Sequence, residues 1–408
     1  MLRLLYKARP FRVPILFLLS TWYSCMHIQT YEDALSYIFQ EELTNKYDVT
    51  QVQKADKALG HPHRAYQNIH IAGTNGKGST AKMVFSILEK AGKKVGCFTS
   101  PHLVDVRERI QTQDGCISKK DFVRLLNKVL ATKISLSYFE LLTMIAFLYF
   151  QEKKCEYAVI EVGLGWLLDA TNIITPVITC ITNIGLDHQE ILWKTIREIA
   201  KQKAWIIKER IPLVLGQRNA DIEKFARQKK ASIIFADRPK KTNLLGKHQN
   251  SNAWIAYAIG KKLWISKKYI LQGLQNVVHQ GRLQYLSPNL CIDGAHNING
   301  FLSLKTYLHT MQKKYKKIIY CFALKKGKNP KNTILPIFGR DKQYIIVKKR
   351  GYKLENVISL EKEMKWLTYS MKTPTQIKNL AKKNTKILYM VFGSLYMIGA
   401  FLPSGKNC

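Results

Sequence analysis

The sequence lacks paired cysteines. Its eight cysteines are spread from Cys25 to Cys408, and no two of them form a C-x-x-C motif. This spacing argues against a zinc site and against a disulfide framework. We therefore expect reduced thiols, as in a cytoplasmic protein. A chain of 408 residues with 46% hydrophobic residues can bury the cores of two or three domains without such cross-links.

Acidic residues are scarce. Asp and Glu number 28 against 65 Lys and Arg, which gives a net charge of +37. Such a charge attracts polyanions in general. The lysines are scattered, however, and form neither a basic arm nor a recognisable nucleic-acid module. We favour compositional drift, as an AT-rich coding sequence would give, over a specific nucleic-acid partner.

The first 25 residues contain no run long enough to span a membrane. The apolar segment 13–19 follows four basic residues and resembles a signal peptide with a short core. The alternative is an over-extended start, because Met26 directly precedes HIQTYEDALSYIF, which looks like the beginning of a domain. We favour Met26 as the natural start, treat residues 1–25 as an extension, and expect a cytoplasmic protein without a membrane partner.

The sequence is rich in glycine at one place, Asn68–Thr80 (NIHIAGTNGKGST). A short apolar strand runs into Gly73, Gly76 and Gly78, and a helix follows from about residue 79 to 91. Glycine allows positive φ and close approach to a ligand, and a helix N-terminus favours an anion. Lys77 and Ser79 add a charge and a hydroxyl. The string departs from the standard P-loop in spacing, but it predicts a phosphate-binding loop.

Downstream, predicted strands and helices alternate. The predicted strands are 94–98, 157–161, 177–184, 291–293, 318–322, 344–347 and 387–392. The predicted helices are 31–39, 121–132, 139–151, 249–263 and one from about 299. This alternation predicts an α/β fold with a mostly parallel sheet covered by helices on both faces. In such sheets ligands bind at the carboxyl ends of the strands.

Polar side chains follow several of these strands. Ser100, Glu161 and His188 each come after a different strand, and together they could hold Mg²⁺ against ATP oxygens. Each also has a simpler role available, as a turn residue, a helix-dipole partner or a hydrogen-bond donor. Asp293 suits a ribose or a nucleotide-bound water, or else caps the next helix.

These residues carry a resemblance to a known family. The matching segments occur in family order and cover nearly everything after Met26: GTNGKGST (73–80), FTSPHLVDVRERI (98–110), SYFE (137–140), EVGLG (161–165), LDATN (168–172), TNIGLDHQEIL (182–192), KA–IIK (203–208), GKHQNSNA (246–253), GRL (281–283), DGAHN (293–297) and FGSLYMIG (392–399). The chain resembles folylpolyglutamate synthase/dihydrofolate synthase, a branch of the Mur ligase superfamily. SYFE and LDATN favour this branch over a peptidoglycan Mur ligase.

The resemblance implies a P-loop-type, mostly parallel sheet domain like the Mur ligase central domain over residues 26–281. A smaller Rossmann-like C-terminal domain over 282–408 would follow, with the active site between the two. The implied reaction is ATP-dependent and ADP-forming. It joins L-glutamate to tetrahydrofolate, to dihydropteroate or to both, through an acyl phosphate. The implied enzyme is a monomer with two Mg²⁺ sites, with K⁺ or another monovalent cation as an option.

The resemblance also implies residue roles. ATP contacts would come from Gly73, Thr74, Asn75, Gly76, Lys77, Gly78, Ser79, Asn252, Arg282 and Asp293. Cations would be held by Ser100, Glu161, His188 and Lys203, the last as the carbamylated lysine of the family. The pterin end of the substrate would lie near Tyr138, Phe139, Glu140, Leu168, Asp169 and Ala170. Lys77, His188, Lys203 and His296 are the catalytic candidates.

Four tryptophans stand where the family has glycine: Trp166, Trp193, Trp205 and Trp264. Overpacking of this kind costs about 1–3 kcal/mol at each close-packed site, and positive φ adds to that cost. One explanation is a catalytically impaired homologue that binds nucleotide or polyanion. The other is a codon, UGA foremost, that the organism reads as glycine and that is rendered here as tryptophan. We favour the codon explanation, and UGG codons at these four positions would exclude it. It leaves Leu167, in place of the family arginine, unexplained.

Overall fold

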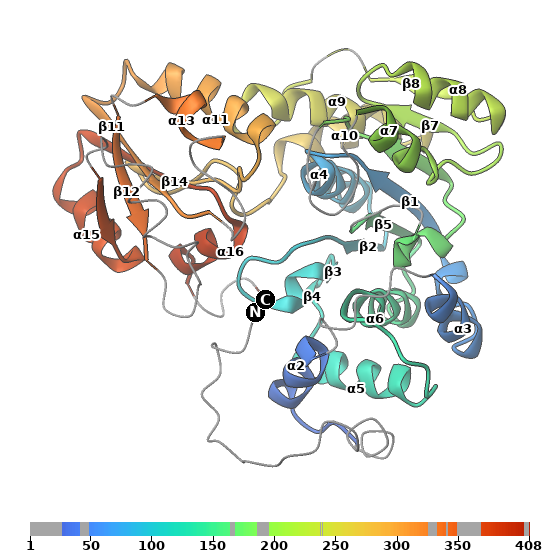
Figure 1. The fold of residues 1–408 in the computed structure, drawn as a ribbon. Helices are drawn as coiled ribbons and strands as arrows, with labels where there is room; N and C mark the ends of the chain where they lie inside the picture. The colour runs from blue at the N-terminus through green and yellow to red at the C-terminus, as the bar shows by residue number, and fades with distance from the viewer. Residues whose placement is uncertain are drawn as a thin grey trace.

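The computed structural model describes residues 27–40, 49–163, 168–185, 196–236, 238, 240–324, 333–339, 342–348, 369–403 and 408. Within these residues the strands form two sheets, which lie in separate lobes (Figure 1). The first sheet is built from residues 67–235 and the second from residues 284–392. The predicted α/β fold class is confirmed.

The first sheet has the order β4-β3-β2-β5-β1-β6-β7-β8. Its central strand β1 lies between β5 and β6 and is parallel to both, with Ile71 opposite Glu161 of β5. This register places the carboxyl end of β5 beside the start of the glycine loop. The strands are β1 Gln67–Ala72, β2 Val95–Phe98, β3 Ile110–Thr112, β4 Gly115–Cys116, β5 Tyr157–Glu161, β6 Ile178–Ile181, β7 Leu213–Leu215 and β8 Ile233–Phe235. At one edge, β3 pairs antiparallel with both β2 and β4, and the other recorded pairs are parallel.

Helices cover both faces of this sheet (Figure 1). One face carries α4 (Lys77–Lys90), α9 (Lys247–Lys262) and α10 (Lys267–Gln275), which bury a core with Ile69 and Ile71 of β1. The opposite face carries two groups of helices over separate cores. These are α2 Tyr31–Gln40, α3 Thr50–Ala58, α5 Lys119–Leu130 and α6 Tyr138–Glu152 in one group, and α7 Ile196–Ala204 and α8 Ala220–Gln228 in the other. Short 3-10 turns are η3 Pro62–Ala65, η4 Val106–Arg109 and η6 Ala170–Ile173.

The second sheet has the order β13-β12-β11-β14-β10-β9, parallel except at β9. The strands are β9 Gln284–Ser287, β10 Leu290–Ile292, β11 Lys317–Phe322, β12 Gln343–Val347, β13 Tyr369–Lys372 and β14 Ile387–Phe392. Cores lie on both faces, under helices that include α11 and α15. The helices and turn are α11 Ile298–Met311, α13 Leu335–Phe338, α15 Pro374–Lys383, α16 Leu395–Ile398 and η7 Gly399–Phe401.

Long apolar strands were easier to predict than short ones. The predicted strands 157–161 and 387–392 match β5 and β14 at both ends. The predicted strand 177–184 is shortened to β6, because its polar last residues leave the sheet to support the glycine loop. The strands β3, β4, β7, β8, β9 and β13 were not predicted, since two to four residues carry little periodicity.

The expectation of unpaired thiols is wrong for one pair. Cys116 of β4 and Cys408 form a disulfide, with Cα atoms 5.1 Å apart and 292 positions between them in sequence. The fold brings the last residue of the chain to the edge of the first sheet, and cysteine spacing along the sequence carries no sign of such a contact. Cys97, Cys155, Cys180, Cys291 and Cys321 are buried and free.

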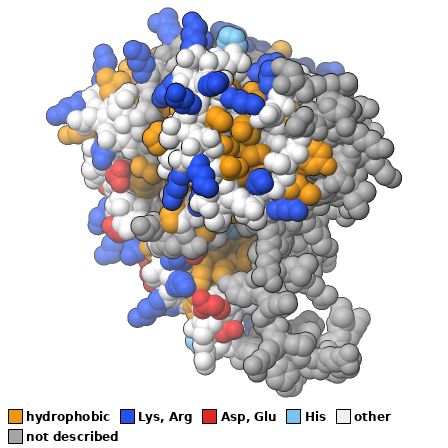
Figure 2. Space-filling model, turned by 90° about the vertical axis from the view of Figure 1, so that its left-hand side faces the viewer, with side chains coloured by type: hydrophobic (Ala, Val, Ile, Leu, Met, Phe, Trp, Pro, Cys, Tyr) orange, Lys and Arg blue, Asp and Glu red, His pale blue; other side chains and the backbone are white. Residues whose placement is uncertain are grey.

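The charge of the chain is spread rather than gathered. Figure 2 shows Lys and Arg side chains standing apart from one another on the face of the second lobe, around a group of hydrophobic side chains. This agrees with the scattered lysines of the sequence, and the described residues of that face form no continuous basic track. In the part of the chain that the structure describes, no helix has the length and apolar character to cross a membrane.

Candidate active site

The glycine loop leaves β1 and ends at the first turn of α4. Gly73 and Gly76 have φ values of 143° and 83°. A Cβ atom at Gly73 would lie 1.8 Å from Oγ1 of Thr182, and one at Gly76 would lie 2.4 Å from Oδ1 of Asn252. Both positions therefore require glycine. α4 begins at Lys77 without a side-chain cap, so its first N–H groups suit an anion.

A second segment supports the loop from behind. Residues after β6 accept hydrogen bonds from the backbone of the glycine loop. Thr74 N donates to Asn183 O at 3.0 Å, and Asn75 N donates to Asn183 Oδ1 at 2.9 Å. The hydroxyl of Thr182 donates to Asn75 O at 2.7 Å. This supporting role of Thr182 and Asn183 was not predicted, although both lie within the TNIG segment that carries the resemblance.

Lys77 closes the loop with its own side chain. Its Nζ donates to Gly73 O at 2.9 Å and to Thr74 O at 3.4 Å, and the side chain is half-buried. The loop carbonyls hold the ammonium group in place. The charge lies inside the curve of the loop, where it can meet a phosphate.

Glu161 and Ser100 come together as expected. Glu161 ends β5 and is 3% exposed, and its Oε2 accepts a hydrogen bond from Ser100 N at 3.0 Å. Burial raises the pKa of Glu161, while the charges of Lys77, Arg282 and Lys82 and the Ser100 N–H oppose that rise. Carboxylate and hydroxyl oxygens are donors that suit Mg²⁺. No three His, Cys, Asp or Glu residues of the described chain cluster as a metal site. The third predicted ligand, His188, lies outside the described residues.

A hydrogen-bond chain converges on the hydroxyl of Ser79, which is buried. Asn252 Nδ2 donates to Gln249 Oε1 at 3.0 Å, and Gln249 Nε2 donates to Ser79 Oγ at 3.3 Å. The Nδ1 atom of His279 lies 3.1 Å from the same Oγ. Burial, then the charges of Arg282 and Lys82, lower the pKa of His279 well below its ordinary value. Neither Gln249 nor His279 was predicted, although Gln249 lies within the GKHQNSNA segment and His279 lies close to the GRL motif.

Lys203 is fully buried in α7. It shares the inner face of that helix with Ile199 and Ala200, which are also buried. Lys201, two residues away, is exposed. The alternative of a solvated lysine at position 203 is therefore excluded. A buried, charged lysine needs compensation, either from partners or from chemical modification.

In the second lobe, Asp293 braces its own loop. Its Oδ2 accepts from Leu283 N and its Oδ1 from Ala295 N, each at 2.8 Å. The alternative role as a cap of α11 is excluded, because Asn297 is the cap and accepts from Gly300 N at 2.9 Å. Nδ1 of His296 pairs with Gly294 O at 2.8 Å.

Arg282 lies directly against this loop. A Cβ atom at Gly294 would come within 2.1 Å of Nη1 of Arg282, so glycine is required there for the guanidinium to fit. Arg282 precedes β9 and Asp293 follows β10. The fold therefore brings together two residues that were predicted to contact the nucleotide.

The two lobes meet at the glycine loop. Asn297 Nδ2 donates to Asn75 Oδ1 at 3.0 Å, which joins the DGAHN segment of the second lobe to the loop of the first. A second contact lies nearby, where Leu103 packs against Gly281 and Gly399. The phosphate-loop residues and the candidate residues of the second lobe thus face one another across a single junction.

Of the predicted pterin residues, Tyr138, Phe139 and Ala170 pack into the core under α6, on the face of the first sheet opposite α4. Glu140 accepts from Ser137 N at 2.7 Å within a capping box, and Asp169 accepts from Thr171 N at 2.9 Å as the cap of η6. Tyr138 stacks on Phe39, and the ring of Phe139 packs against Gly163. Ala170 is buried, and Leu168 is 42% exposed. The acidic members hold local backbone, and pterin binding stays a prediction for all six residues.

The tryptophans behave differently from the prediction. Trp264 follows α9 with a φ of 61°, a left-handed position of the kind that glycine favours at helix ends. Its side chain is 93% exposed, and that of Trp205 is 42% exposed. The expected positive φ is present at Trp264, but overpacking is absent at both positions, because both side chains project toward solvent. Trp166, Trp193 and Leu167 lie outside the described residues.

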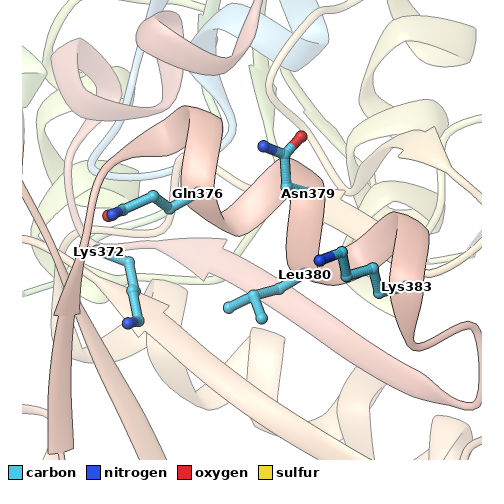
Figure 3. Close-up of a pocket in the computed structure, with 5 residues that line it drawn as sticks. All are labelled: Lys372, Gln376, Asn379, Leu380 and Lys383. Carbon is cyan, nitrogen blue, oxygen red and sulfur yellow. The ribbon is translucent and has the colours of Figure 1, made fainter.

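A separate hollow of about 200 Å³ lies beside α15 in the second lobe. Figure 3 shows that Gln376, Asn379, Leu380 and Lys383 come from this helix and that Lys372 comes from the end of β13. None of these residues belongs to the junction between the lobes. The hollow is therefore not the candidate active site.

Comparisons with known proteins agree with the geometry. Residues 71–235 match the Mur ligase middle domain. The chain is 33% identical over 356 residues to dihydrofolate synthase/folylpolyglutamate synthase of Bacillus subtilis, which covers 74% of this chain and 82% of that protein. It is similar to the crystal structure of folylpolyglutamate synthase from Thermotoga maritima, with 29% identity, a TM-score of 0.79, and coverage of 93% and 98%.

The fold is also shared with a bifunctional folylpolyglutamate synthase/dihydrofolate synthase from Yersinia pestis, solved in complex with AMPPNP and a Mn ion. That structure has a TM-score of 0.81 and 23% identity, and the match covers 92% of this chain and 97% of the other.

Proposed function

The chain belongs to the folylpolyglutamate synthase/dihydrofolate synthase family, and on that premise we propose that it joins L-glutamate to a folate, to dihydropteroate or to both, at the expense of ATP. One observation carries the proposal. The glycine loop, with Lys77 inside its curve and the buried Glu161 beside it, is bonded through Asn75 to Asn297 of the second lobe. A phosphate-binding loop, a carboxylate and a second lobe that can close over them are what acyl activation by ATP requires.

The nucleotide would lie in this junction, with its phosphates on the N-terminus of α4. Gly73, Thr74, Asn75, Gly76, Lys77, Gly78 and Ser79 supply backbone and side-chain donors there. Asn252 reaches the loop at Gly76, and Arg282 and Asp293 lie together on the opposite side. These contacts are proposed for ATP on the strength of their position.

The oxygen donors at the end of β5 fit a divalent cation. Glu161 is a buried carboxylate that accepts the backbone N–H of Ser100, and its pKa is raised because burial outweighs the nearby positive charges. Ser100 and Glu161 would hold Mg²⁺, joined by His188. Mg²⁺, when bound, would neutralise charge on the phosphate oxygens. Lys203, carbamylated, would hold a second cation, and a monovalent ion such as K⁺ is a further proposed component.

The residues would act mainly by placing the reactants. The substrate carboxylate attacks the γ-phosphorus of ATP, the bond to the bridging oxygen breaks, and ADP leaves. The glutamate amine then attacks the acyl carbon, loses a proton, and inorganic phosphate departs. Lys77 would stabilise the charge that develops on the phosphoryl oxygens, and His296 lies on the loop facing it. Exclusion of water by the closed lobes would protect the acyl phosphate.

Three further features belong to the proposal. The boundary between the two units would fall at residues 281 and 282, between α10 and β9. The enzyme would act as a monomer, with Tyr138, Phe139, Glu140, Leu168, Asp169 and Ala170 near the pterin. It would work in the cytoplasm, where ATP is supplied. Cytoplasmic thiols are kept reduced, so the Cys116–Cys408 disulfide is a feature to test in this location.

The test is direct. Purified protein is incubated with ATP, Mg²⁺ and labelled glutamate, with dihydropteroate and tetrahydrofolate offered separately. We expect label to enter one or both pteridine products with one ADP formed for each glutamate added. Nucleotide binding without any product from either acceptor would overturn the proposal and favour an impaired homologue.

A further inference from the structure

His279 stands apart from the residues that the family resemblance implies, yet it touches the phosphate loop. It lies on the segment that joins the two sheets, between α10 and β9, three residues before Arg282. Its side chain is half-buried, and its Nδ1 lies 3.1 Å from Oγ of Ser79, two residues beyond Lys77. A linker residue that contacts the start of α4 is placed to influence how the loop presents its groups.

The hydroxyl of Ser79 can form only a small number of hydrogen bonds. Such a group carries one hydrogen and two acceptor sites. Gln249 Nε2 donates to one acceptor site, and the orientation of Gln249 is itself set by Asn252 Nδ2, which donates to its Oε1. One hydrogen and one lone pair therefore remain, to be shared between His279 and a ligand at the loop.

The tautomer of His279 decides this division. If Nδ1 is bare, the serine hydrogen points to it, and the remaining lone pair faces the ligand side, where it suits a cation. If Nδ1 carries the hydrogen, both serine lone pairs are occupied, and the serine hydrogen faces outward, where it suits a phosphate oxygen. The two tautomers thus present opposite polarities to a ligand.

The surroundings favour the first arrangement. A Cβ atom at Gly78 would lie 3.4 Å from Cε1 and 3.6 Å from Nε2 of His279, and 3.2 Å from Oε2 of Glu161. The Nε2 edge of the ring and the Glu161 carboxylate therefore line the same space beside Gly78. An N–H at Nε2 is attracted to that carboxylate, whereas a bare Nε2 lone pair is repelled by it.

We propose that His279, as the Nε2–H tautomer, is a positioning residue that accepts the hydrogen of Ser79 and so aims a serine lone pair at the cation that accompanies the nucleotide. The proposal rests on the proposed function, because it assumes a nucleotide and a divalent cation at this loop. It adds a chain of hydrogen bonds in which Asn252 donates to Gln249, Gln249 donates to Ser79, and Ser79 donates to His279.

The variants separate this role from simple packing. His279→Leu keeps a half-buried side chain but removes the acceptor, while His279→Asn can offer an amide oxygen near the place of Nδ1. Val278→Ala is the matched control, since Val278 is the preceding residue of the same segment and is 76% exposed. Binding of a fluorescent ATP analogue is titrated with Mg²⁺ and, separately, in EDTA.

For His279→Leu we expect the Mg²⁺ concentration at half-maximal nucleotide binding to rise about tenfold or more, the usual loss when a residue that orients a metal ligand is removed. His279→Asn should recover most of it, Val278→Ala should match the wild type, and all four proteins should bind nucleotide equally in EDTA. Equal weakening of metal-free and metal-dependent binding in His279→Leu would overturn the proposal.

A measurement on the unmodified protein keeps the proposal testable even if the leucine variant does not fold. Ring nitrogen NMR of histidine-labelled protein, assigned by the signal lost in His279→Asn, should show hydrogen on Nε2 and none on Nδ1. Hydrogen on Nδ1 would contradict the proposal. Failure of the proposed function looks different, since the wild type itself would then show no Mg²⁺-dependent nucleotide binding.

Discussion

The two sides of the lobe junction use their acidic residues in opposite ways. On the first side, Glu161 is buried with a raised pKa, and it accepts one backbone N–H from Ser100. On the second side, Asp293 accepts two backbone N–H groups and fixes the path of its own loop. A buried carboxylate with a raised pKa and few hydrogen bonds points to a ligand, whereas one that accepts several backbone N–H groups stabilises the local structure. The comparison predicts where substitutions will damage chemistry and where they will damage folding.

The largest effect is expected at Lys77, on the first side. Lys77→Ala should lower kcat by about 100- to 1,000-fold, the loss typical of removing one preorganised charge-stabilising donor. Steady-state kinetics with ATP and glutamate check this. Lys90→Ala, in the last turn of the same helix and exposed, should behave as wild type. Full ligase activity in Lys77→Ala would remove Lys77 from the phosphate site.

Lys203 comes next. Lys203→Ala should lower kcat by about 100-fold, because carbamylation would convert a buried cation into an oxygen ligand for the proposed second cation. Formate or acetate should restore part of the activity by filling the vacated space. The exposed neighbour gives the control: Lys201→Ala should lose little. Equal, small losses at both positions would leave Lys203 without a role in the reaction.

Some residues of the candidate site could be predicted from the sequence, and others could not. Motif spacing placed the glycine loop, Glu161, Ser100 and Asp293 at strand ends, because the carboxyl ends of parallel strands gather ligands. It could not find Gln249 and His279, which reach Ser79 from α9 and from the linker after α10. Contacts between segments so distant in sequence depend on packing, which has no periodic signal. The Cys116–Cys408 pair was missed for the same reason.

Paired substitutions of the two carboxylates test the comparison itself. Glu161→Gln should weaken Mg²⁺-dependent nucleotide binding with little change in stability, since the neutral amide avoids burying a charge. Asp293→Asn should destabilise the protein by about 1–3 kcal/mol, because an amide N–H would face the N–H of Leu283 or Ala295. Thermal unfolding of both variants is the measurement. The reverse order of stability would break the comparison.

The smallest effect lies away from the junction, at the end of α9, and again depends on what the backbone requires. Trp264 has a φ of 61° and a side chain that is 93% exposed, so its conformation costs energy and its ring gains little packing. Trp264→Gly should therefore stabilise the protein by about 0.5–1 kcal/mol, after allowance for the greater freedom of glycine in the unfolded chain.

Trp205 is the control, since it lies outside the positive-φ region and its ring packs edge-on against Phe225 at 5.5 Å. Trp205→Gly should destabilise by about 1 kcal/mol through lost packing and added chain freedom. Unfolding midpoints of the two variants decide the matter. A rise at position 264 and a fall at position 205 would mean that the backbone demands glycine only at the first, so that a glycine codon at 205 would need a reason other than local conformation.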